Sequence, residues 1–122
     1  MDSRFATLHT GAKMPLMGLG TFLSPDTSEL IEIIKKAVIE DGYRQIDTAS
    51  LYGNEEAIGK ALKECFAAGI KREDLFIVTK LWREDYAIDK IENAIKKSLE
   101  KLQLDYIDLY LVHWTVPVFD YT

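Results

Sequence analysis

The chain has 122 residues, of which 48% are hydrophobic, and a formal net charge of −5. This length allows one domain at most, and the hydrophobic content is typical of a globular protein rather than a disordered one. The acidic balance, with Lys and Arg spread along the chain, excludes nucleic acid or an anionic membrane as the main expected partner.

Cysteine and histidine usage bear on the compartment and on metal binding. The start of the chain, Met1–Arg4, lacks the basic and apolar runs of a signal peptide, and we expect no membrane span. The single cysteine, Cys65, cannot form an internal disulfide, which favours a reducing compartment such as the cytoplasm. Its helical spacing predicts a buried hydrophobic residue rather than a catalytic thiol. Because His9 and His113 are far apart, no metal site is expected.

The first third of the chain predicts a hairpin, a strand and a helix. Residues 5–15 predict a short hairpin, and Leu16–Leu19 predicts a short strand that ends at Gly20. Asp26 or Thr27 is expected to cap a helix. The apolar residues of that helix recur on one face, at Leu30, Ile31, Ile34, Ala37 and Val38.

The rest of the chain alternates between strands and helices. Strands are predicted around Gln45–Asp47, Phe76–Lys80 and Tyr106–Val112, and helices at about Asn54–Ala67 and Asp89–Leu102. The strand at Phe76 is a continuous apolar run, which is typical of a strand covered by helices. Strict alternation predicts a parallel sheet with right-handed crossovers.

Two architectures fit this order, a doubly wound sheet and a (β/α)₈ barrel. Residues 18–23, Gly-Leu-Gly-Thr-Phe-Leu, lack the third glycine of a Rossmann turn, although a flavodoxin-like sheet stays open. A complete barrel takes roughly 250 residues. Residues 113–122 have no helical pattern. We therefore expect a single incomplete domain over residues 1–122: a hairpin, then the first four strands of a TIM barrel, truncated after strand four.

Polar residues recur at the predicted strand ends. Asp47, Lys80 and His113 are separated by equal intervals of 33 residues, and Tyr52 follows Asp47 by five. The interval is about one strand–helix unit, so the three side chains would leave the same end of neighbouring strands. Each residue alone has an ordinary explanation as a turn former, a rim aromatic or a solvent-reaching lysine. Together they predict an active site, because α/β enzymes place their chemistry at this rim.

These side chains fit acid–base chemistry on a carbonyl group. An isolated phenol is a weak acid near neutral pH, but a nearby ammonium favours the phenolate and makes Tyr52 a better proton donor. An aspartate beside the lysine keeps the lysine charged and in place. A neutral imidazole can hydrogen-bond the same substrate oxygen. Since no side chain supplies hydride, a reduction would need a cofactor.

Several segments resemble the aldo-keto reductase family. Residues 42–55, Gly-Tyr-Arg-Gln-Ile-Asp-Thr-Ala-Ser-Leu-Tyr-Gly-Asn-Glu, closely resemble its first signature. Residues 79–82 and 104–114 resemble its later strand segments, and Gly18–Thr21 also fits. The resemblance implies a (β/α)₈ barrel closed at its bottom by the hairpin. It also implies an enzyme that reduces aldehydes and ketones to alcohols with NADPH, less often NADH, and no metal.

The resemblance further implies roles for individual residues. Tyr52 would be the general acid, Lys80 and Asp47 the pair that tunes it, and His113 the group that orients the carbonyl. The cofactor's nicotinamide end would contact Gly20, Thr21 and Asp47. The substrate pocket would be lined by Phe22, Leu51, Trp82, His113 and Trp114.

The chain also departs from the family pattern. Phe22 stands where several relatives carry Trp, and Thr115 where Pro commonly follows His-Trp. In this family most contacts to the cofactor phosphates come from later strands, so the 122 residues alone are expected to be inactive. The resemblance implies a small carbonyl substrate and a full-length monomer. The alternative is a non-catalytic truncated barrel, an association or regulatory module that self-associates through its open strand edge.

Overall fold

A hairpin precedes the main sheet. The structure is a computed structural model that describes residues 4–116. Strands β1 (Phe5–Thr7) and β2 (Lys13–Pro15) pair antiparallel, as the sequence predicts for residues 5–15. Their turn contains Gly11, whose φ of +89° lies in the left-handed region that glycine adopts without strain.

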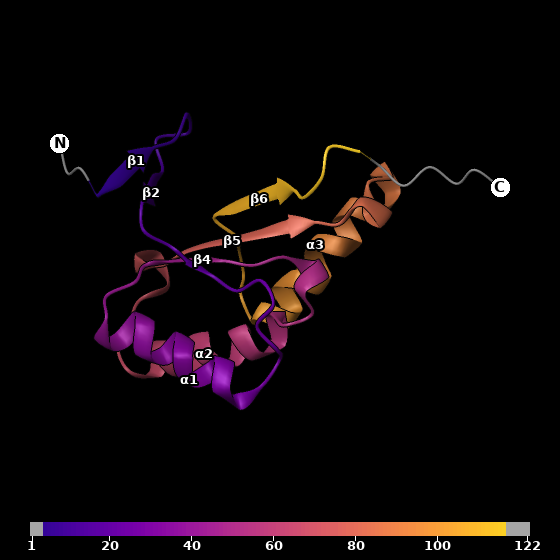
Figure 1. Ribbon diagram of the computed structural model, residues 1–122. Coiled ribbons are helices and arrows are strands. Elements are labelled where there is room, and N and C mark those ends of the chain that lie inside the picture. The colour runs from indigo at the N-terminus through magenta and orange to yellow at the C-terminus, as the bar shows by residue number, and fades with distance from the viewer. Residues whose placement is uncertain (1–3, 117–122) are drawn as a thin grey trace.

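The main sheet has four parallel strands, β3 (Leu19–Gly20), β4 (Gln45–Asp47), β5 (Phe76–Leu81) and β6 (Leu109–Val112). Their spatial order is their order along the chain. Figure 1 shows β4, β5 and β6 side by side in that order. A doubly wound sheet would instead reverse strand order at a switch point. The strand order therefore identifies part of a (β/α) barrel, which confirms the predicted fold class.

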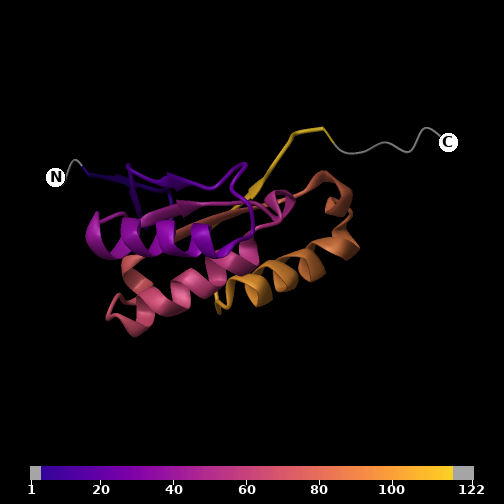
Figure 2. The same cartoon turned by 60° about the horizontal axis from the view of Figure 1, so that its bottom comes forward.

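Three helices connect these strands and lie together on one face of the sheet (Figure 2). Helix α1 (Ser28–Lys35) continues into a π-helical turn, η1 (Lys36–Glu40). Helices α2 (Glu55–Ala67) and α3 (Ile88–Leu102) follow. Three 3₁₀ turns complete the connections, η2 (Ser50–Tyr52), η3 (Arg72–Asp74) and η4 (Arg83–Asp85). Helices on a single face are typical of a barrel wall, whereas a doubly wound sheet carries helices on both faces.

The core lies between the sheet and these helices. Cys65 is fully buried there, and burial raises the pKa of its thiol, as expected of a packing residue. Within residues 4–116 no helix combines the length and apolar character needed to cross a membrane. The largest fully buried apolar side chains are Ile34, Val38, Ile46, Ile58, Leu62, Leu75, Ile77, Val78 and Leu102.

The predicted strand at Leu16–Leu19 is wrong in its position. Strand β3 begins only at Leu19, and Leu16 and Met17 are 63% and 70% exposed. The backbone N–H of Leu16 donates to the carbonyl of Arg4 at 2.9 Å, so this residue extends the hairpin instead of joining the sheet. An apolar run alone could not distinguish the two pairings.

The predicted strand Tyr106–Val112 is also longer than the observed β6. The strand begins at Leu109. Asp108 accepts bonds from the Ile77 backbone N–H at 2.9 Å and the Arg72 guanidinium at 2.7 Å. Arg72 also lies over the Tyr106 ring, with 3.9 Å between the guanidinium carbon and the ring centroid. The Asp108 backbone N–H still donates to the Ile77 carbonyl at 3.1 Å, so side-chain contacts replace strand pairing only at residues 106 and 107.

The expected cap of the first helix caps a different helix. Thr27 occupies the N-cap position of α1, but its side chain makes no capping hydrogen bond. The carboxylate of Asp26 instead accepts a hydrogen bond from the backbone N–H of Ala57 at 2.7 Å. Asp26 thus satisfies a free donor in the first turn of α2 and ties the loop before α1 to that helix.

Candidate active site

The strand register brings the predicted polar residues to one rim. Gly20 lies beside Asp47 in the β3–β4 pair, and Lys80 lies beside Leu111 in the β5–β6 pair. His113 follows directly after β6, and its backbone N–H donates to the carbonyl of Leu81 at 3.1 Å. The equal spacing in the sequence therefore places these residues at the carboxyl ends of adjacent strands.

The ammonium of Lys80 is the centre of the site. Its Nζ donates to the Asp47 carboxylate at 2.5 Å, to the backbone carbonyl of Thr48 at 2.8 Å and to the Tyr52 hydroxyl at 3.3 Å. The Lys80 side chain is only 12% exposed, whereas that of Asp47 is 37% exposed. A largely buried cation is thus held by a counter-ion and placed against a phenol.

The Tyr52 side chain is positioned by the turn that carries it. Tyr52 ends the 3₁₀ turn η2, and its backbone N–H donates to Ala49 at 3.0 Å. Gly53 follows with a φ of +67°, a conformation that glycine allows and that lets the chain enter α2. The Tyr52 ring packs against Phe22, with centroids 5.1 Å apart, and against the edge of His113 at 5.7 Å.

The half-buried His113 ring contacts the Tyr52 and Trp82 rings and has a lowered pKa. Burial lowers the pKa of its imidazole below the ordinary 6.5, and the Lys80 ammonium lowers it further, while Asp47 opposes both. Its Nδ1 is buried and has no hydrogen-bond partner within residues 4–116. His113 is therefore neutral near pH 7, and Nε2 is the nitrogen left to meet a ligand.

We expect an NMR titration to give His113 a pKa below the value of the same chain unfolded in urea. In the range between these two pKa values the unfolded state binds more protons, so this group lowers folding stability as the pH falls below about 6.5. Replacing Lys80 with Met should raise the His113 pKa, because one of its two lowering causes is removed. A matched change at the exposed Lys96, 69% exposed on α3, should leave it unaltered. An equal His113 pKa in the Lys80 variant would contradict this account.

A buried asparagine, Asn54, joins two loops of the site, although the sequence predicted no role for its side chain. Asn54 is fully buried. Its amide donates to the carbonyls of Thr21 at 2.8 Å and Ser24 at 3.0 Å, and its oxygen accepts from the Thr48 hydroxyl at 3.0 Å. Asn54 thus fixes the loop after β3 against the loop that carries Tyr52. Its position directly before α2 and its place in the segment 42–55 were the signals that could have marked it.

The residues predicted to contact a cofactor differ in their exposure to solvent. A Cβ built on Gly20 would meet nothing within 4 Å, so the backbone there faces open space. Thr21 is only 1% exposed, and its hydroxyl donates to the Asp47 carbonyl at 3.0 Å. The hydroxyl of Thr21 therefore supports Asp47, while Gly20 and the Asp47 carboxylate are accessible.

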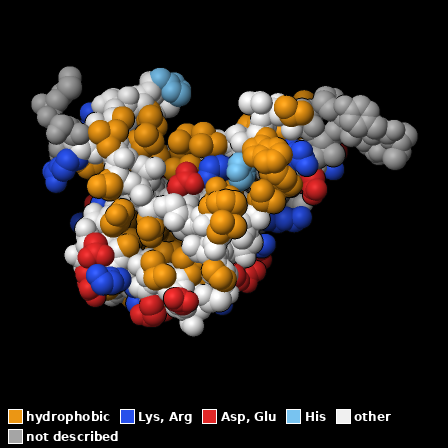
Figure 3. Space-filling model, in the orientation of Figure 1, with side chains coloured by type: hydrophobic (Ala, Val, Ile, Leu, Met, Phe, Trp, Pro, Cys, Tyr) orange, Lys and Arg blue, Asp and Glu red, His pale blue; other side chains and the backbone are white. Residues whose placement is uncertain are grey.

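The predicted substrate-lining aromatics form one side of the rim. Trp82 contacts His113 at 5.5 Å and Trp114 at 5.2 Å between ring centroids. Tyr86 holds Trp114 in place, because its hydroxyl accepts from the Trp114 N–H at 2.9 Å and donates to the Trp114 carbonyl. Phe22 and Leu51, 63% and 45% exposed, border the site beyond Tyr52. Figure 3 shows a broad hollow on this face, with acidic, basic and histidine side chains next to apolar ones.

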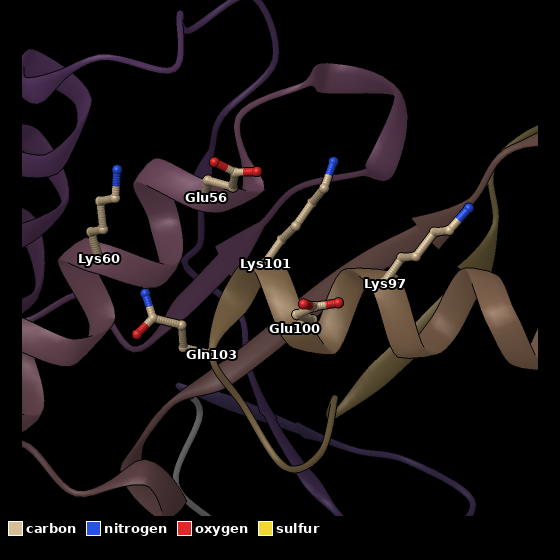
Figure 4. Close-up of a pocket in the computed structure, with 6 residues that line it drawn as sticks. All are labelled: Glu56, Lys60, Lys97, Glu100, Lys101 and Gln103. Carbon is tan, nitrogen blue, oxygen red and sulfur yellow. The ribbon is translucent and has the colours of Figure 1, made fainter.

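A separate hollow lies between α2 and α3 and has a different character. It encloses about 420 Å³ and is lined by charged groups of both signs, as Figure 4 shows. Its lining residues are Glu56, Lys60, Lys97, Glu100, Lys101 and Gln103. Exposed, mutually compensating charges on a helix surface are typical of a solvated face. This hollow adds nothing to the chemistry of the rim.

Parallel strands, helices on one face and a polar cluster at the strand ends define the class as the wall of a (β/α) barrel with a polar cluster at its rim. Residues 16–122 match the Aldo/keto reductase family. The chain belongs to the aldo/keto reductase family.

Relatives in this family agree with the fold. The chain is 50% identical over 107 residues to a glyoxal reductase of Bacillus subtilis, covering 88% of this chain and 37% of the relative. It is 52% identical over 114 residues to a methylglyoxal reductase of Escherichia coli, covering 93% and 39%. The solved aldose reductase of Schistosoma japonicum superimposes with a TM-score of 0.85 at 40% identity, covering 95% of this chain and 37% of that one. The chain thus spans well under half the length of these relatives.

Proposed function

We propose that the whole protein reduces aldehydes and ketones to alcohols with NADPH, and that this chain supplies the acid–base part of its active site. The observation that carries the proposal is the Lys80 ammonium, which contacts both the Asp47 carboxylate at 2.5 Å and the Tyr52 hydroxyl at 3.3 Å. The names of its relatives, glyoxal reductase and methylglyoxal reductase, support carbonyl reduction.

The accessible groups of the rim fit the nicotinamide end of such a cofactor. Open space over Gly20 would admit a flat ring against the backbone. The Asp47 carboxylate, 37% exposed, retains acceptor capacity for a ribose hydroxyl besides its bond to Lys80. The bound cofactor would supply the hydride, which none of the side chains here can provide.

The chain's own residues would manage the proton. Tyr52 donates its hydroxyl proton to the carbonyl oxygen as negative charge develops there. The Lys80 ammonium stabilises the resulting phenolate, and the Asp47 carboxylate holds this ammonium in place. The neutral imidazole of His113 donates one hydrogen bond to the same oxygen and fixes its direction. The enclosed position of Lys80, 12% exposed, strengthens these interactions because little water screens them.

Absorbance at 340 nm would test the proposal. The whole protein with NADPH and methylglyoxal should oxidise the cofactor and form alcohol in equal amounts, and NADH measured in parallel should give the lower kcat/KM. The 122-residue chain alone should show neither turnover nor tight NADPH binding by fluorescence titration. No turnover of any aldehyde or ketone by the whole protein would contradict the proposal, and micromolar NADPH binding by the chain alone would contradict its dependence on further strands.

A further inference from the structure

Arg83 lies over two tryptophans of the rim. It is the first residue of η4, directly after Trp82. Its guanidinium carbon is 5.1 Å from the Trp82 ring centroid and 5.0 Å from that of Trp114. The two indole rings contact each other edge to face, 5.2 Å apart. The cation is therefore held by the same rings that form one side of the rim.

The bonding of Arg83 differs from that of Arg72. The Arg72 guanidinium donates to the carbonyls of Leu75 and Tyr106 and forms an ion pair of 2.7 Å with Asp108. Arg83 forms neither an ion pair nor a hydrogen bond through its guanidinium within residues 4–116. The Nε atoms of both arginines are buried without an acceptor there, so the two differ only in the terminal nitrogens, which have partners in Arg72 and none in Arg83. Glu84 and Asp85 follow on the same turn without pairing with it.

A stacked guanidinium is suited to bind a planar anion. Aromatic rings lie against the two flat faces of such a guanidinium. Its N–H donors lie in the plane of the group and stay free to bind both oxygens of a carboxylate. The other cation of the rim, Lys80, is already bonded to Asp47, Thr48 and Tyr52. Among the described residues, Arg83 is thus the cation of the rim whose N–H donors remain available for a ligand.

Two ring contacts connect Arg83 to the reacting groups. Two successive ring contacts, His113 to Trp82 at 5.5 Å and Trp82 to Arg83 at 5.1 Å, separate the imidazole from the guanidinium. We propose that Arg83 binds a carboxylate at the far end of the carbonyl substrate, so that the preferred substrates are aldehydes and ketones that also carry a carboxylate. This inference rests on the proposed function, and it names the substrate class of that same site.

Matched substrates would test this assignment in the whole protein. The probes are 4-carboxybenzaldehyde and its neutral isostere 4-carbamoylbenzaldehyde, each with saturating NADPH. In R83Q, kcat/KM for the acid should fall about 10–100-fold, mainly through KM, because a hydrogen-bonded charge is lost. Turnover of the amide should stay unchanged, and R83K should recover part of the loss. The control K96Q removes the same charge at a distant exposed site and should affect neither substrate.

A second measurement does not depend on turnover. Trp82 and Trp114 both contact Arg83, so their part of the tryptophan fluorescence reports on this position. Benzoate should change the emission of the parent protein in a saturable way, benzamide should not, and R83Q should abolish the benzoate response. Equal losses for acid and amide, or an unaltered benzoate response in R83Q, would overturn the assignment. If the parent turns over neither aldehyde yet binds benzoate through Arg83, the proposed function fails while the anion site stands.

Discussion

Replacing Tyr52 with Phe in the whole protein should lower kcat by about 10²–10⁴-fold, the usual contribution of a positioned general acid. The variant loses one oxygen atom and its proton. Lys80 keeps its bonds of 2.5 Å to Asp47 and 2.8 Å to Thr48, so the cation stays in place. The ring contacts with Phe22 and His113 do not depend on the hydroxyl. Structure and cofactor binding should therefore survive while proton transfer is lost.

Three measurements separate this role from a structural one. Steady-state kinetics should show that kcat and kcat/KM fall together, since the interaction is made only in the transition state. Fluorescence titration should give the same NADPH affinity as the parent, and the melting temperature should change little. The control Y43F removes a hydroxyl from a tyrosine outside the rim and should retain full activity. Near-normal turnover in Y52F would show that another group donates the proton.

The site as a whole depends on contacts that converge from separate elements. Lys80 alone contacts Asp47, Thr48 and Tyr52, which come from β4 and the loop that follows it. Asn54 and Asp26 fix the surrounding loops to each other and to α2. A rigid sheet edge with loops tied to it is how a fold holds reacting groups within a few tenths of an ångström.

The convergence of Asp47, Lys80 and His113 at one rim could be predicted from the sequence, because it follows from the repeat of the fold. One strand and one helix separate Asp47 from Lys80 and Lys80 from His113, and parallel pairing aligns the strand ends. The apolar run at Phe76–Lys80 likewise predicted β5 to within one residue. Periodic patterns of this kind report which residues share a face, and that information is local in the sequence.

The supporting residues could not be predicted, because their partners are distant in the sequence. Asp26 caps a helix that begins 29 residues later, and Asn54 bonds to carbonyls 30 and 33 residues earlier. Tyr86 holds the backbone of Trp114, 28 residues away. No local pattern marks such pairs, since Asp and Asn before a helix equally indicate an ordinary cap. The misplaced strand at Leu16 has the same origin, because its partner is Arg4 in the hairpin.

The second large effect is expected at Gly59, where α2 and α3 come closest. A Cβ at this position would lie 2.2 Å from the carbonyl oxygen of Lys101 and 2.9 Å from the carbonyl carbon of Leu102. Both are backbone atoms at the end of α3, so no side-chain rotation relieves the overlap. Gly59→Ala should therefore reduce the free energy of unfolding by about 1–3 kcal/mol, as overpacking of a core does. Against a total of about 5–15 kcal/mol, this is a large loss.

The sign of this effect distinguishes packing from helix propensity. In an exposed helix interior, Gly→Ala is stabilising by about 1 kcal/mol, so propensity alone predicts the opposite result. Urea unfolding of G59A against the parent would decide between them. K63A, at an exposed position of the same helix, should change stability by less than about 0.5 kcal/mol. A G59A variant as stable as the parent would mean that the two helices do not approach this closely.

Gly59→Ala should also affect the active site, because it would alter the contact between α2 and α3. Moving α3 away from α2 would draw Ser98 from the Glu55 carboxylate, to which its hydroxyl donates at 3.1 Å. Glu55 also accepts from Thr79 at 2.9 Å, and Thr79 precedes Lys80 in β5. G59A in the whole protein should therefore lower kcat as well as stability, whereas K63A should lower neither. Full activity in a destabilised G59A would show that the position of Lys80 does not depend on this buried link.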